Sequence, residues 1–155
     1  MYDPKRLKPI YINLLSLANA SMIKVQLIGI TEQLKQTFDG QDMQISFLDD
    51  EVHALNAVEQ IQPAVILLNY QLQESETRSY IKALLKMSSN SKIVVIAKGL
   101  TDNEILACLV AGAKGYQDMK SLDQYMIKMI KVIDAGEAWV SRRMVAKLLD
   151  EWVEK

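Results

Sequence analysis

Short apolar runs alternate with longer segments of mixed polarity along most of the chain. The short runs have the length and near-continuous apolar character of buried strands, whereas the longer segments repeat apolar residues at helical spacing. This pattern predicts strands at 9–17, 43–50, 64–69, 92–97 and 113–119. It predicts helices at 21–38, 51–61, 75–87, 101–112 and 121–136. Gly29 interrupts the first of these helices, whereas Thr101 and Glu104 form a capping box at the start of the fourth.

The order of these elements, a strand followed by a helix five times, predicts the fold class. Strands that alternate with helices form right-handed crossovers and a parallel sheet with helices on both faces. We therefore predict a doubly wound α/β domain at 9–136, with a five-stranded parallel sheet. Sites in such folds form at the carboxyl ends of the strands. The pattern places these ends at 17–19, 49–50, Asn69, Ala97 and 117–119.

The segment behind this domain, 137–155, has an apolar stripe of its own. Ser141 suits the N-cap of a sixth helix there. The apolar stripe consists of Val140, Met144, Val145, Leu148, Leu149, Trp152 and Val153. We therefore expect an extra C-terminal helix or linker after the α/β domain.

Composition narrows the function classes. The chain has 155 residues and 17.6 kDa, with 50% hydrophobic and 24% charged residues, which suits one domain with a real core. A net charge of −1 gives no global reason to expect nucleic acid or an anionic membrane as partner. The single cysteine, Cys108, excludes an internal disulfide or a multi-cysteine metal site, and we expect it in the core and the single histidine, His53, on the surface.

The absence of two kinds of sequence signal completes these expectations. No apolar run approaches the roughly 20 residues that span a bilayer, and no P-loop or nucleophile-elbow motif is present. We therefore expect a cytoplasmic protein that is not an enzyme, contacts no membrane and needs neither a metal nor another cofactor.

Three apolar stretches and the segment behind them resemble a known family. PAVILLN (63–69), IVVIA (93–97) and AGAKGY (111–116), at this spacing, resemble the receiver domain of bacterial two-component response regulators. GEAWVSRRMVAKLL (136–149) resembles the linker of the NarL/FixJ subfamily, whose members continue into a LuxR-type helix-turn-helix. The resemblance covers roughly residues 10–150 and implies the flavodoxin-like receiver fold.

The positions that receivers use for phosphotransfer are filled differently in this chain. In the family, an aspartate ends the third strand, an acidic pair follows the first, a hydroxyl residue ends the fourth, and an aromatic and then a lysine lie in the fifth. The residues here are Asn69, the carboxylate-free LSLANAS (15–21), Ala97, Tyr116 and Met119. An amide is a poor nucleophile, and Mg²⁺ is usually held by carboxylates. The neighbouring lysine, at 120, should face the other side of the strand. The resemblance therefore implies a pseudo-receiver that does not accept a phosphoryl group.

Several of these residues also have a purely structural interpretation. The amide of Asn69 either satisfies a backbone group in the following loop or holds the pocket in one signalling state. Asp49 and Asp50 either cap the next helix or partly replace the missing acids. Tyr116 is either fixed at a partner surface or keeps the swinging motion of the family's aromatic.

The resemblance further implies regulation through protein contacts. The contact surface would be formed by the fourth helix, the fifth strand, the fifth helix and the tail helix. Candidate contact residues are Tyr125, Met126, Met129, Trp139 and Trp152. Trp139 should also seat the tail on the domain, and Trp152 either packs on the domain or anchors another subunit.

Two functions remain open on the sequence alone. In the first, the chain acts as a homodimer or with a regulatory protein, and controls transcription through a LuxR-type DNA-binding domain absent from this chain. In the second, the pseudo-receiver senses a small molecule at the carboxyl ends of its strands.

Overall fold

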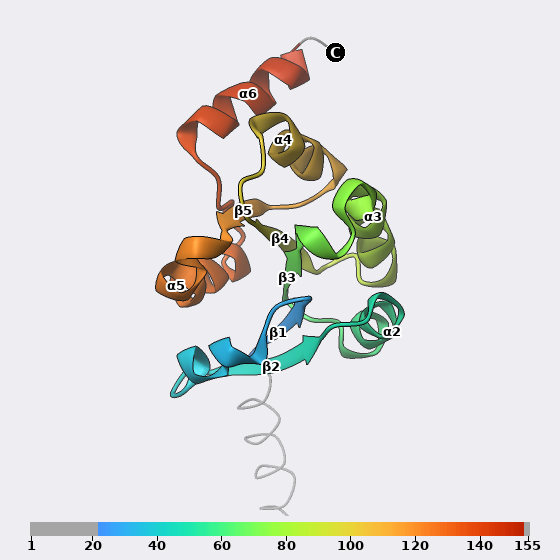
Figure 1. Cartoon of the computed structure of the whole chain (residues 1–155), viewed down its shortest axis with the longest axis vertical. Coiled ribbons are helices and arrows are strands. Elements are labelled where there is room, and N and C mark those ends of the chain that lie inside the picture. The colour runs from blue at the N-terminus through green and yellow to red at the C-terminus, as the bar shows by residue number, and fades with distance from the viewer. Residues whose placement is uncertain (1–21, 154–155) are drawn as a thin grey trace, which may run out of the picture.

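The computed structural model describes residues 22–153, which form an α/β domain with an additional C-terminal helix. Five parallel strands make one sheet in the order β2-β1-β3-β4-β5 (Figure 1). The strands are β1 (Ile23–Ile28), β2 (Met43–Leu48), β3 (Val65–Asn69), β4 (Lys92–Ala97) and β5 (Gly115–Asp118). The α-helices are α2 (Glu51–Ile61), α3 (Thr77–Met87), α4 (Asp102–Ala111), α5 (Leu122–Asp134) and α6 (Arg142–Val153). The predicted fold class is confirmed.

Helices cover both faces of the sheet, and each face has its own core. On one face, strand residues such as Leu67 pack with α5 and the short 3-10 helix η1 (Glu32–Phe38). On the other face, residues such as Leu68 pack with α2, α3 and α4 (Figure 1). Because successive strand residues enter opposite cores, β3 and β4 are almost entirely apolar, as the sequence pattern predicts.

The predicted helix at 21–38 is wrong. Its first part is β1, and only its second part, η1, is helical, as a 3-10 helix. Apolar residues at alternate positions, Ile23, Val25 and Leu27, also fit a strand, and their neighbour Gln26 is buried on the opposite face. Gly29, which the sequence analysis treats as a flaw in a helix, has φ +73° and follows the strand directly. The predicted strand at 9–17 lies outside the described residues.

This correction moves the carboxyl end of the first strand. The residues that follow β1 are Gly29, Ile30, Thr31 and Glu32, rather than 17–19. The Thr31 side chain accepts a hydrogen bond from the backbone of Gln33 and so caps η1. The whole connection from β1 to β2 is therefore short, and η1 takes the place of a full helix.

The later elements follow the predictions closely. Helix α2 and strand β4 have the predicted bounds, and the Thr101–Glu104 capping box begins α4. The sixth helix is present, and the Met144 backbone N–H donates to the Ser141 hydroxyl over 3.1 Å, as expected of an N-cap. Within residues 22–153, no helix combines the length and the apolar character needed to cross a membrane.

The segment between α5 and α6 returns along the sheet before α6 begins. Trp139 forms a parallel bridge with Gly115, through backbone hydrogen bonds from Trp139 to Lys114 and from Tyr116 to Trp139. Helix α6 then lies beside α4, beyond the β5 edge of the sheet (Figure 1). The tail is thus packed on the domain.

Candidate functional site

The amide of Asn69 bridges the carboxyl ends of two neighbouring strands. Asn69 is the last residue of β3, and its Nδ2 donates to the carbonyl oxygen of Gly29 over 2.8 Å. Its Oδ1 accepts from the backbone N–H of Gln71 over 3.0 Å and caps the 3-10 turn η2 (Tyr70–Leu72). Both polar ends of the amide are therefore bound to backbone, which is the structural role that the sequence analysis left open for this residue.

Packing closes the space around this bridge. A Cβ atom at Gly29 would lie 3.2 Å from the Cβ of Asn69 and 3.4 Å from the Leu72 side chain. The positive φ of Gly29 also disfavours any other residue there. The end of β1 therefore lies close against Asn69 without an intervening side chain.

No pair of carboxylates directly follows the end of β1. The segment LSLANAS (15–21) precedes β1 and does not follow it, so its use in the sequence analysis was wrong. The segment that follows β1 in the structure begins with Gly29, Ile30 and Thr31, and the Ile30 side chain is buried. The first carboxylate in this segment is that of Glu32. Between residues 22 and 153, no three His, Cys, Asp or Glu side chains group closely enough to hold a metal ion.

The two aspartates after β2 have separate positions. Asp50 accepts a hydrogen bond from the His53 backbone N–H over 2.8 Å and is the N-cap of α2, as its helix-capping interpretation predicts. Asp49 borders an open hollow of about 500 Å³. The hollow is lined by Gly29, Ile30, Thr31, Glu32, Phe47, Leu48, Asp49 and Leu72. It therefore lies over the ends of β1 and β2, rather than over Asn69, Ala97 and Met119.

Two tyrosines contact the residues that flank the loop between β4 and α4. The Tyr116 hydroxyl donates to the Ala97 carbonyl oxygen over 3.3 Å, and the Tyr70 hydroxyl donates to Glu104 Oε2 over 3.2 Å. Burial, and then the charge of Asp118, raise the pKa of Tyr116, so it stays a neutral donor. Since Ala97 has no hydroxyl group, the contact of Tyr116 is with backbone alone.

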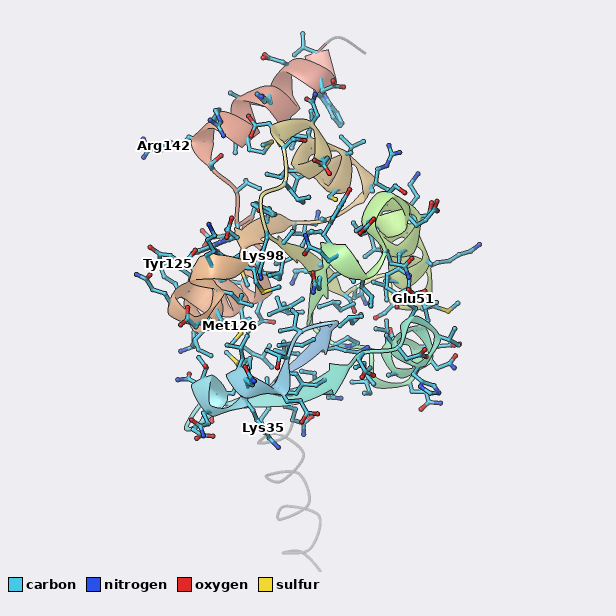
Figure 2. The ribbon with its side chains drawn as sticks, in the orientation of Figure 1. Lys35, Glu51, Lys98, Tyr125, Met126 and Arg142 are labelled. Atoms are coloured by element: carbon cyan, nitrogen blue, oxygen red, sulfur yellow. The ribbon has the colours of Figure 1, made fainter. Side chains whose placement is uncertain are left out.

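The last predicted pocket position, Met119, does not present a charge either. It follows β5 directly and packs partly buried against the core on the α5 side. Lys120 is exposed, and its backbone N–H donates to the Asp118 carboxylate over 2.8 Å. A second lysine, Lys98, is exposed directly after Ala97; the sequence analysis missed it, although its place next to a strand end is a usable signal (Figure 2).

The candidate contact residues fall into two groups. Met126 and Met129 are fully buried in the core, so their assignment to an interface was wrong. Their helical spacing from Tyr125 gave no information on which side of α5 faces the sheet. Figure 2 shows Tyr125 on the outer side of α5 and Met126 on the side of the sheet. Trp152, in contrast, is largely exposed.

Trp139 seats the tail, as predicted. Its indole Nε1 donates to the side-chain oxygen of the buried Gln117 over 3.0 Å, and its ring lies 6.3 Å from that of Tyr125, at 51°. The Gln117 amide in turn donates to the Ser121 hydroxyl over 2.8 Å. A Cβ atom at Gly115 would lie 2.6 Å from the Trp139 carbonyl oxygen, so this approach requires glycine.

A charged clamp joins α6 to α4, and the sequence analysis did not predict it. Asp102, the first residue of α4, accepts from Arg143 over 3.0 Å and from Lys147 over 2.8 Å. Lys147 and Arg143 lower the pKa of the Asp102 carboxyl below its ordinary value. The two basic residues lie four apart on α6, a spacing that places them on one helix face and could have indicated a shared acidic partner.

Comparisons with known proteins agree with this architecture. No family model matches the chain. The chain is 26% identical over 119 residues to the oxygen regulatory protein NreC of Staphylococcus epidermidis. It is 28% identical over 111 residues to the uncharacterized transcriptional regulatory protein YxjL of Bacillus subtilis. These matches cover 74% and 71% of the chain but 54% and 51% of the relatives, so the chain spans about half their length.

Solved receiver structures share the fold. A LuxR-family response regulator from Aurantimonas sp. superposes with a TM-score of 0.69 at 15% identity, over 86% of this chain and 99% of that one. The isolated REC domain of RcsB from Salmonella enterica superposes with a TM-score of 0.70 at 13% identity, over 83% and 98%. The chain therefore has the receiver fold. The sequence relatives are regulatory proteins, and these solved structures are a LuxR-family response regulator and a REC domain.

Proposed function

We propose that this chain is a receiver domain of a NarL/LuxR-type response regulator that works without accepting a phosphoryl group. The observation that carries the proposal is the hydrogen bond from Asn69 Nδ2 to the Gly29 carbonyl oxygen. The side chain at the acceptor position is an uncharged amide that holds two strand ends together. It has no carboxylate to attack a phosphoryl donor.

The rest of the pocket supports the same proposal. Glycine and a buried isoleucine directly follow β1, Ala97 ends β4, and Met119 follows β5. The pocket thus lacks the paired carboxylates that would attract Mg²⁺ and the hydroxyl and ammonium groups that would bind phosphoryl oxygens.

The output of such a module is a protein contact. The chain would act in the cytoplasm as a homodimer or with a regulatory protein, and would control an attached LuxR-type DNA-binding domain in transcription. The length of the curated relatives, about twice the matched region, supports a further domain in the whole protein. The α4–β5–α5 face with α6 is the proposed contact surface, through Tyr125, Trp139 and Trp152.

A phosphodonor experiment tests the absence of phosphotransfer. The chain is incubated with acetyl phosphate and Mg²⁺, and its intact mass is measured beside that of an aspartate-containing receiver. We expect the mass of the chain to stay unchanged while the reference gains one phosphoryl group. The Asn69→Asp variant should also remain unmodified, because the other pocket groups are absent as well. A phosphoryl adduct on an aspartate of the unmodified chain would overturn the proposal.

The ligand-sensing alternative has weaker support. The hollow over β1 and β2 is open to solvent and does not include the residues that replace the phosphotransfer groups. A thermal shift with candidate nucleotides, lost on substitution of Thr31, would favour this alternative.

A further inference from the structure

The outer face of α6 is apolar and uncovered. This face consists of Val145, Leu149, Trp152 and Val153, which are 40%, 58%, 82% and 80% exposed. Val145, Leu149 and Val153 follow one another at four-residue spacing, and Trp152 lies three residues after Leu149, so all four lie on one side of the helix. Met144, which lies on the inner side, is almost completely buried. A tryptophan among three exposed aliphatic residues forms a contiguous patch of the kind that marks an interaction site.

The apolar surface continues onto α4. A hollow of about 340 Å³ between the two helices is lined by Leu109, Val110, Leu148, Glu151 and Trp152. Val110 of α4 is itself 54% exposed. A side chain from another molecule that packs against Trp152 would therefore also meet an apolar depression beside it.

The charges of α6 are distributed in an unusual order. Arg142 and Arg143 begin the helix, whereas Asp150 and Glu151 lie near its end. This order opposes the helix dipole, which favours acids at the N-terminus and bases at the C-terminus. The contact with Asp102 accounts for Arg143. Within residues 22–153, Arg142, Asp150 and Glu151 form no ion pair, and Figure 2 shows Arg142 directed away from α4.

We propose that the outer face of α6 binds the same face of a second copy of this chain, with the two helices antiparallel. In that arrangement the basic start of each helix lies beside the acidic end of the other, and the apolar residues meet between them. A parallel pair would instead place like charges together. A two-fold symmetric dimer of this kind covers the apolar face and pairs the opposite charges, and it uses the same surface of both copies, as an isologous dimer requires. The inference deepens the dimer part of the proposed function, and it assigns the contact to α6 rather than to Met126 or Met129 of α5.

Sedimentation velocity over a range of protein concentrations tests this dimer. We expect a monomer–dimer equilibrium in which Trp152→Ala and Leu149→Ala each weaken the dimer at least about tenfold. Both side chains are exposed in the single chain, so circular dichroism and the melting temperature of the monomer should stay unchanged. Val52→Ala, at an exposed valine of α2, is the matched control and should dimerise like the unmodified chain.

A charge exchange tests the antiparallel arrangement. Arg142→Glu should weaken the dimer, as should Asp150→Arg, because each places like charges side by side; Asp150 is used because Glu151 lines the hollow that faces α4. The variant that carries both changes should recover most of the affinity. A chain that stays monomeric at every concentration overturns the proposal, as does a dimer that is insensitive to Trp152→Ala and Leu149→Ala. Failure of the double variant to recover overturns the antiparallel pairing. The phosphodonor experiment is independent of oligomeric state, so each proposal can fail alone.

Discussion

At position 69, an amide and a carboxylate of nearly equal size have opposite consequences. The amide donates to the Gly29 carbonyl oxygen and accepts from Gln71, so both of its ends are satisfied. A carboxylate keeps the second contact but replaces the first by repulsion between two oxygens that lie 2.8 Å apart in the present geometry. An asparagine therefore fits these strand ends better than an aspartate would.

This comparison predicts the effect of Asn69→Asp on stability. The variant should lower the free energy of unfolding by about 1–2 kcal/mol at neutral pH, because a partly buried acceptor loses its donor. Urea denaturation measures the change. Asn56→Asp, on the exposed surface of α2, introduces the same chemical change without this contact and should have little effect. Equal stability of the unmodified chain and the Asn69 variant would show that the bridge contributes nothing.

Single residues could be placed from the sequence where a strand end identified them. Asn69, Ala97 and Tyr116 lie at the strand positions expected of them, because β3, β4 and β5 are strongly apolar or flanked by clear turn signals. The hydrogen-bond partner of Asn69 could not be predicted, since it required the true position of β1. The burial of Met126 and Met129 also escaped the sequence, because methionine suits a core and an interface equally well.

At the scale of elements, the junction between β5 and the tail depends on one close backbone contact. Gly115 allows the Trp139 backbone to approach the edge strand, and the Trp139 indole then reaches Gln117. The short bridge therefore fixes where the tail leaves the sheet, and α6 begins from that point. An extended loop here would leave α6 without a defined origin.

Gly115→Ala should loosen this junction. The new methyl group would clash with the Trp139 carbonyl oxygen, so we expect a loss of about 1–3 kcal/mol of stability. The indole should also become more exposed to water. Fluorescence in a Trp152→Phe background measures this directly, since Trp139 is then the only tryptophan. Emission that stays unshifted, with unchanged stability, would contradict the structural role given to Gly115.

Two segments of the domain, α4 and residues 21–38, show what the sequence pattern can and cannot decide. The capping box at Thr101 located α4 because two side chains and their spacing agree on one helix start. In contrast, the apolar residues of 21–38 satisfied both a helical and an alternating pattern. Gly29 resolves this ambiguity only when its positive φ is known, because the sequence does not distinguish a flaw in a helix from the turn after a strand.

At the scale of the whole molecule, the Asp102 clamp connects the tail with the loop that follows β4. Asp102 begins α4 immediately after this loop, and it binds two basic residues of α6. The Tyr116 and Tyr70 hydroxyls donate to the residues that flank this loop, the Ala97 carbonyl oxygen and the Glu104 carboxylate. We therefore expect a change in the position of α6 to reach the loop after β4 through this one carboxylate.

The clamp predicts a dependence of the α6 position on pH and salt. The folded state holds the pKa of Asp102 below its unfolded value, because Lys147 and Arg143 favour the charged carboxylate. The clamp therefore stabilises the folded state above the ordinary carboxyl pKa and is lost as the pH falls through the lowered value. Added salt should weaken the clamp at neutral pH, since its two ion pairs lie near the surface.

Hydrogen exchange at fixed pH should detect this coupling without a change of fold. We expect the amides of α6 to exchange faster in Asp102→Asn than in the unmodified chain, while those of β3 and β4 keep their protection. Asp123→Asn, on α5, removes a carboxylate that contacts its own helix and should leave α6 unchanged. In the unmodified chain, the amide NMR signals of Arg143 and Lys147, far from the acids at the end of α6, should show a titration step with a midpoint below that of an ordinary carboxyl, and this step should vanish in Asp102→Asn. If α6 exchanges equally in both proteins, its position depends on the apolar contacts of Met144 and Leu148 and on the Trp139 junction, and the clamp does not connect the tail to the pocket.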